Sequence, residues 1–243
     1  MAQKHERMRQ EHDRLLDERL ESEEFRAEHW DDLGAEGARD SLVHLLESTL
    51  ALEGDVIECG VYRGASLFRM ARRLKTLGSD KELYACDSFE GFPTETVGKL
   101  DTSFLRPVSK LRRKFTGAGD VPERIERFCG YYDTPIRVVK GFFSDTLPAL
   151  TDRRFCFIHL DVDLYQSYVD CLTLLYPCLA PGGVVVFDDY NPSKLPGVAK
   201  WPGATLAVNE FFADRPESVE RCETRDRPAW FVRKAAVSAQ RVA

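Results

Sequence analysis

Six acidic side chains stand at the ends of short apolar runs, and their type and position could do chemistry. A carboxylate can accept a proton, bind the two hydroxyls of a ribose or coordinate a hard cation such as Mg²⁺. Carboxylates so far apart in sequence can act together only if the fold brings the ends of these runs to one place. The six residues are Glu58, Asp87, Asp161, Asp163, Asp188 and Asp189.

The apolar runs are typical of strands in a parallel sheet, and helical spacing follows several of them. We therefore predict an α/β fold with a doubly wound, mostly parallel, seven-stranded sheet and an antiparallel edge strand. Because parallel strands open their carboxyl ends on one edge, the six acids should converge there. The expected strands cover residues 55–58, 82–86, 136–139, 155–160, 184–187, 219–223 and 229–232.

The segment GDVIECGVYRG, residues 54–64, predicts a strand, a tight glycine turn and the start of a helix. A doubly wound sheet binds nucleotide-like cofactors at such a turn. The segment lacks the G-x-G-x-x-G spacing of dinucleotide sites, and Glu58 would repel a pyrophosphate. Its charge suits the ammonium and sulfonium groups of S-adenosylmethionine (SAM). Asp87 is placed to bind the ribose hydroxyls, and KGFFSD, residues 140–145, could line an adenine pocket.

So many carboxylates in one crevice would repel each other unless hydrogen bonds or a cation compensated them. Asp161, Asp188 and Asp189 offer hard oxygen ligands with no helpful His or Cys beside them, which favours Mg²⁺ or Ca²⁺ over zinc. We predict Mg²⁺, which leaves coordination positions for substrate oxygens. The alternative is that Asp188 and Asp189 only cap a loop.

Composition limits the possible partners. The formal net charge is −6 and the isoelectric point about 5.5, which argues against a general affinity for nucleic acid or anionic membranes. No apolar run approaches a membrane span and the first residues are charged, so we expect a cytoplasmic protein. The seven cysteines form no C-x-x-C pair and are expected to be reduced core residues.

We expect a single α/β domain, residues 38–243, that contains the whole predicted site. A helical arm, residues 1–37, precedes it. The arm is dense in charge and reads as a solvated helix or as a clasp on a second copy, and we expect a homo-oligomer. Two segments show no regular spacing of apolar residues, and we expect them to be lid insertions. They lie near residues 94–120 and 190–203.

Five blocks, in this order and spacing, resemble the macrocin O-methyltransferase family. They are GDVIECGVYRG, ACDSFEGFP, KGFFSDTLP, HLDVDLYQS and PGGVVVFDDY, and the resemblance covers about residues 40–234. It implies a Rossmann-like class I methyltransferase that uses SAM and Mg²⁺ to methylate a sugar or phenolic hydroxyl of a natural product. The resemblance also implies residue roles: the family's metal ligands match Asp161, Asp188 and Asp189, and its general base matches Asp163.

The predicted site therefore has three parts: the base Asp163, the metal ligands, and a cofactor site. His159, on the strand before Asp161, is a rival base, although a buried core histidine is the simpler interpretation. The cofactor site is predicted to contain Glu58, Gly60, Tyr62, Arg63, Gly64, Ser66, Asp87, Ser88, Phe142, Ser144, Asp145 and Asp161.

The expected acceptor is a small-molecule glycoside or a phenol, and three rival functions stay open. A catechol-type O-methyltransferase would use the same metal chemistry on a flat aromatic diol. A NAD(P)-linked oxidoreductase is opposed by the missing G-x-G-x-x-G. A non-catalytic SAM-fold binding protein is suggested only by the charged arm.

Overall fold

The computed structural model describes residues 40–62, 64–93, 98–101, 122–123, 125–126, 129, 135–192, 201–224 and 228–236. The expected arm at 1–37, most of the segment 94–120, residues 193–200 of the second expected lid, and Arg63 lie outside this part of the chain. The predictions made for them stay predictions.

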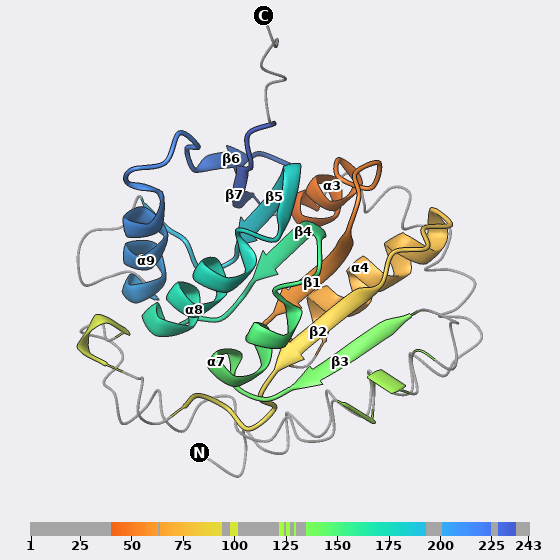
Figure 1. Cartoon of the computed structure of the whole chain (residues 1–243), viewed down its shortest axis with the longest axis horizontal. Coiled ribbons are helices and arrows are strands. Elements are labelled where there is room, and N and C mark those ends of the chain that lie inside the picture. The colour runs from red at the N-terminus through yellow and green to blue at the C-terminus, as the bar shows by residue number, and fades with distance from the viewer. Residues whose placement is uncertain are drawn as a thin grey trace, which may run out of the picture.

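A seven-stranded sheet in the order β3-β2-β1-β4-β5-β7-β6 forms the centre of the fold. The first five strands of the chain run parallel, and β7 pairs antiparallel with both β5 and β6. The predicted doubly wound α/β fold is therefore confirmed (Figure 1). The strands are β1 (Asp55–Cys59), β2 (Leu83–Asp87), β3 (Ile136–Lys140), β4 (Phe155–Leu160), β5 (Leu179–Phe187), β6 (Glu220–Cys222) and β7 (Ala229–Arg233).

Helices cover both faces of the sheet (Figure 1). On one face, α4 (Ala65–Thr76) buries a stripe at helical spacing that includes Leu67, Met70 and Leu74, beside α3 (Ser41–Glu47). On the other face, α8 (Tyr165–Leu175) and α9 (Pro202–Phe212) pack on β4 and β5. Three further elements are short: η1 (Lys99–Asp101), α7 (Phe143–Thr146) and η2 (Leu147–Leu150).

One boundary differs clearly from the sequence prediction. The strand expected at 184–187 begins at Leu179, because the glycines that read as a turn are part of the strand. Gly182 has a φ of +80°, and its amide donates to the Lys234 carbonyl at 2.9 Å. This backbone pairing, which sequence periodicity does not reveal, keeps the segment in the sheet.

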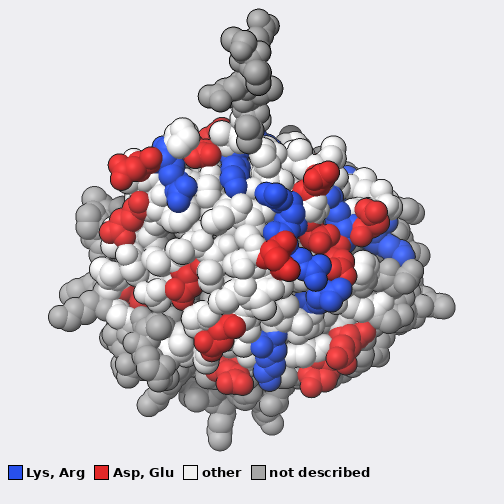
Figure 2. All heavy atoms as spheres, viewed as in Figure 1, with Lys and Arg blue, Asp and Glu red and all other residues white. Residues whose placement is uncertain are grey.

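The surface carries both signs of charge. On the face shown in Figure 2, Lys and Arg side chains are interspersed with Asp and Glu rather than gathered into one basic patch. All seven cysteines are free, and five of them are buried. Among the described helices, none has the length and apolarity to cross a membrane.

Candidate active site

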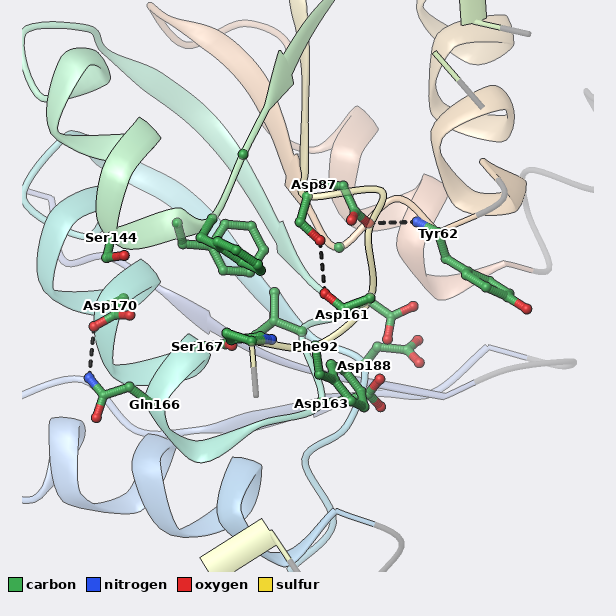
Figure 3. Close-up of a pocket in the computed structure, with 18 residues that line it drawn as sticks. Tyr62, Asp87, Phe92, Ser144, Asp161, Asp163, Gln166, Ser167, Asp170 and Asp188 are labelled. Carbon is green, nitrogen blue, oxygen red and sulfur yellow. Dashed lines mark hydrogen bonds between the residues drawn. The ribbon is translucent and has the colours of Figure 1, made fainter. Parts of the chain in front are cut away.

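A cavity of about 360 Å³ opens at the carboxyl ends of the parallel strands. It extends from the β1–α4 loop, past the ends of β2 and β3, to the loop after β4 (Figure 3). The acids Asp161, Asp163 and Asp188 lie together on one side of it, and Ser144 and Asp170 lie at the other. The structure therefore confirms the predicted convergence of strand-end acids for Asp161, Asp163 and Asp188, and also for Asp87.

The β1–α4 loop approaches β4 so closely that only glycine fits at position 60. Gly60 has a φ of +88°, and its amide donates to the Cys86 carbonyl at 2.9 Å. A Cβ there would lie 2.0 Å from the Asp161 carbonyl oxygen. The glycine turn of the sequence thus joins the β1–α4 loop to the start of the acidic loop after β4.

Asp87 holds the same loop from the side of β2. Its Oδ2 accepts hydrogen bonds from the amides of Val61 and Tyr62, each at 2.8 Å, and its Oδ1 accepts from Phe89 at 2.8 Å. Asp87 also lines the cavity, so the residue predicted to bind ribose is placed where it could do so. Oδ1 has a second lone pair that remains available to a ligand hydroxyl, whereas Oδ2 already accepts two amides.

The far end of the cavity is formed by the turn after β3 and by α8. Phe142 and Ser144 line it, as predicted, whereas Asp145 is exposed and does not. Ser88 and Tyr62 also line it, but Ser66 and Gly64 do not. Sequence reasoning missed Gln166, Ser167 and Asp170, although their spacing on a helix directly after the D-x-D could have indicated a shared face.

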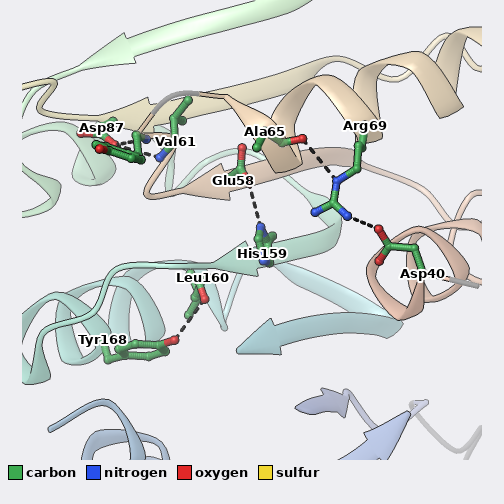
Figure 4. A network of polar contacts seen from close by, with 10 residues as sticks. Asp40, Glu58, Val61, Ala65, Arg69, Asp87, His159, Leu160 and Tyr168 are labelled. Atoms are coloured by element: carbon green, nitrogen blue, oxygen red, sulfur yellow. Dashed lines mark hydrogen bonds and ion pairs between the residues drawn. The ribbon is translucent and has the colours of Figure 1, made fainter. Parts of the chain in front are cut away.

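Glu58 lies behind the loop rather than in the cavity. It is fully buried, and its Oε1 is 2.8 Å from Nδ1 of His159, its partner in the neighbouring strand (Figure 4). Burial by itself lowers the pKa of His159, but the hydrogen bond and charge of Glu58 outweigh it, so the pKa is raised. His159 is a buried histidine, and the role of Glu58 toward a cofactor stays a prediction.

The acidic residues after β4 and β5 form a compact group. Asp161, Asp163 and Asp189 offer carboxylate oxygens that all lie within 4.8 Å of one another. The Asp163 amide donates to Oδ2 of Asp189 at 2.8 Å, and Asp163 has a φ of 61°. A left-handed conformation costs a non-glycine residue about 1–2 kcal/mol, so the surrounding contacts must hold it. Asp188 is exposed and lines the cavity beside this group.

The carboxyls of this group are crowded in a poorly solvated place. Burial raises the pKa of Asp161 well above its ordinary value, and the charges of Asp189 and Asp188 raise it further. Burial also raises the pKa of Asp189, with Asp163 and Asp188 adding to the effect. Oxygen donors held this close, at such cost to their ionised forms, fit a hard divalent cation such as Mg²⁺.

This crowding predicts how stability depends on pH in metal-free protein. Because the folded pKa of Asp161 is raised, the group favours the folded state below its unfolded pKa of about 3.9 and loses this contribution as pH rises through the folded pKa. Asp161→Asn should therefore melt higher than wild type in EDTA near about pH 8, with the difference shrinking toward about pH 4.

Calorimetry across that pH range measures the difference, with Asp152→Asn, an exposed carboxylate, as control. Added Mg²⁺ should reduce the difference in melting temperature between the two proteins, because it should stabilise the wild type alone. A lower melting temperature for Asp161→Asn at both ends of the range would show that its carboxylate is compensated within the protein.

The sheet order, the glycine turn and the strand-end acids define a Rossmann-like methyltransferase fold. The family model of the macrocin O-methyltransferases (TylF) matches residues 39–215. The chain therefore belongs to the macrocin O-methyltransferase family, as its sequence blocks predicted.

Two curated relatives illustrate the family. The 8-demethyl-8-(2,3-dimethoxy-alpha-L-rhamnosyl)-tetracenomycin-C 4'-O-methyltransferase of Streptomyces olivaceus is 38% identical over 159 residues, 62% of this chain and 59% of that protein. The mycinamicin III 3''-O-methyltransferase of Micromonospora griseorubida is 33% identical over 157 residues, 62% of this chain and 61% of that protein. The matches thus span about three fifths of each relative's length.

A solved structure supports the same fold. The O-methyltransferase NovP is 28% identical, with a TM-score of 0.63 over 84% of this chain and 80% of that chain. The calicheamicin methyltransferase CalS11 has a TM-score of 0.61 at 22% identity, over 84% of this chain and 78% of its own, a likeness of fold alone.

Proposed function

We propose that this protein is a SAM-dependent O-methyltransferase that methylates a sugar hydroxyl of a natural product with the help of a divalent cation. The observation that carries the proposal is the group of Asp161, Asp163 and Asp189 at the edge of a cavity that begins at the glycine turn. Relatives named for methylation of rhamnosyl and mycinamicin acceptors support a glycoside as the substrate class.

The cavity suggests how SAM would lie. The turn at Gly60 and Tyr62 would receive its methionine part, and Asp87 its ribose hydroxyls. Phe142 and Ser144 would contact its adenine, since they line the end of the cavity beyond β3. The sulfonium would then stand near Asp161, where the main-chain approach of Gly60 brings the two loops together.

The proposed cation ligands are Asp161, Asp188 and Asp189. Asp161 and Asp189 belong to the compact group with Asp163, and Asp188 lines the cavity beside that group. When bound, the cation would lower the pKa of an acceptor hydroxyl. Asp163 would accept the proton of that hydroxyl, because its carboxyl lies at the cavity wall with its backbone held by Asp189. SAM, when bound, would supply the methyl group: the hydroxyl oxygen would bond to its methyl carbon as the carbon–sulfur bond breaks, leaving S-adenosylhomocysteine.

Two measurements test the proposal. Calorimetric titration with S-adenosylhomocysteine should show binding, and NAD(P)H should show none. Transfer of labelled methyl from SAM should then be followed with a panel of glycosides and catechols. Product from glycosides supports the proposal, whereas product from catechols alone would replace the sugar acceptor with an aromatic diol. Failure to bind S-adenosylhomocysteine would overturn it.

A further inference from the structure

Asp101 is a buried carboxylate far from the acidic group in sequence, and the mechanism above does not use it. Its side chain is 1% exposed. Its Oδ1 accepts a hydrogen bond from the Tyr165 amide at 2.6 Å, and its Oδ2 accepts from the Gly98 amide at 3.0 Å. The residue therefore joins η1 to the start of α8, two positions after Asp163.

The contact replaces a cap that α8 lacks. Leu164 precedes the helix and makes no side-chain cap hydrogen bond. The first amides of a helix have no partner within it, and a negative charge beside them is favourable. Asp101 supplies both the acceptor and the charge from a distant segment of the chain.

With Asp101 in place, four amides of the loop from β4 to α8 have a partner, namely those of Asp161, Asp163, Leu164 and Tyr165. The Asp161 amide donates to the Cys59 carbonyl at 3.0 Å, and the Leu164 amide to the Val162 carbonyl at 2.6 Å. The Asp163 amide is held by Asp189 and the Tyr165 amide by Asp101. Two carboxylates thus hold the loop, Asp189 at the strained residue itself and Asp101 two residues after it.

Other segments of the chain pack closely around Asp101. Gly203, in the first turn of α9, faces it so closely that a Cβ would lie 2.6 Å from Oδ1 of Asp101 and 2.9 Å from Cβ of Tyr165. Three segments distant in sequence, η1, the start of α8 and the start of α9, therefore meet around this one carboxylate.

We propose that Asp101 is a positioning residue that holds Asp163 at the cavity wall through the Tyr165 amide. The catalytic consequence of this inference rests on the proposed function. The hydrogen bonds that hold the loop can be tested without any turnover. Losing Asp101 would release the start of α8 and let the left-handed Asp163 relax away from the acceptor hydroxyl. Small displacements of this kind reduce rates strongly while leaving cofactor binding intact.

The test compares Asp101→Ala, Asp101→Asn and Gly203→Ala. We expect Asp101→Ala to lower kcat by about 10- to 100-fold while the affinity for S-adenosylhomocysteine stays unchanged. Hydrogen exchange of residues 161–168 should become faster. Asp101→Asn keeps an oxygen for the Tyr165 amide and should restore most of kcat. Gly203→Ala pushes the carboxylate away and should repeat the effect of Asp101→Ala.

Asp55→Ala is the matched control, because Asp55 also accepts a backbone amide, that of Glu82 at 3.0 Å, but lies at the opposite end of the sheet. It should lose stability without changing kcat or the exchange of residues 161–168. Wild-type kcat and wild-type exchange in Asp101→Ala would overturn the inference. Should that variant fail to fold, unchanged kcat and exchange in Gly203→Ala would do so.

The exchange measurement separates this inference from the proposed function. Wild-type protein that transfers no methyl group would contradict the proposed function. In that case, faster exchange in Asp101→Ala would still support the positioning of the loop, and unchanged exchange would overturn it.

Discussion

The Asp189→Asn variant should transfer methyl groups about 1,000-fold more slowly than the wild type, a loss of roughly 4 kcal/mol of transition-state stabilisation. Asp189 contributes a carboxylate to the acidic group and at the same time accepts the Asp163 amide. Asparagine keeps an oxygen for that amide, so the loop should stay in place while a charged ligand is lost. Initial rates at saturating SAM measure the effect.

The loss should fall on turnover and not on folding or cofactor binding. Affinity for S-adenosylhomocysteine should stay near the wild-type value, because Asp189 does not line the cavity. Asp214→Asn, an exposed carboxylate after α9, should keep full activity. A rate for Asp189→Asn within a few fold of the wild type would remove the acidic group from the mechanism.

The Gly60→Ala variant should lose more than about 4 kcal/mol of unfolding free energy, a large part of the roughly 5–15 kcal/mol that a domain has. The new Cβ would lie 2.0 Å from the Asp161 carbonyl oxygen, and the φ of +88° disfavours a side chain. The Asp161 carbonyl belongs to the backbone directly after β4, so the clash can be relieved only if β1 and β4 move apart. Urea unfolding followed by circular dichroism measures the loss.

Gly78→Ala gives a matched control for this prediction. Gly78 also has a positive φ, +63°, but an added Cβ would meet nothing within 4 Å. It should therefore cost only about 1–2 kcal/mol, the price of the backbone conformation. Equal losses in the two variants would mean that the approach of Gly60 to Asp161 is not tight.

Much of the fold could be predicted because each of the five parallel strands is a largely apolar run that an acid or a glycine ends or follows. The runs before Asp161 and Asp188 are buried on both faces, so they read as central strands without ambiguity. The start of β5 could not be predicted in this way. Its glycines pair with Lys234, and a pairing partner about 50 residues away leaves no local pattern.

The sequence predicts which residues stand at the strand ends, but it predicts less well which way their side chains point. Strand order places every strand-end acid at one edge, but alternation decides which face each side chain takes. Glu58 and His159 occupy paired positions, so they meet each other inside the protein instead of lining the cavity. Asp163 joins Asp161 and Asp189 because its left-handed backbone turns it toward them, and a sequence does not show that.

The central claim is a divalent cation held by strand-end acids beside SAM, and methyl transfer under chelation tests it most directly. The protein would be assayed with SAM and the best glycoside of the panel in EDTA, then during back-titration with Mg²⁺. We predict no product in EDTA, intact binding of S-adenosylhomocysteine, and recovery of turnover as Mg²⁺ is added. Undiminished turnover in EDTA would contradict the account.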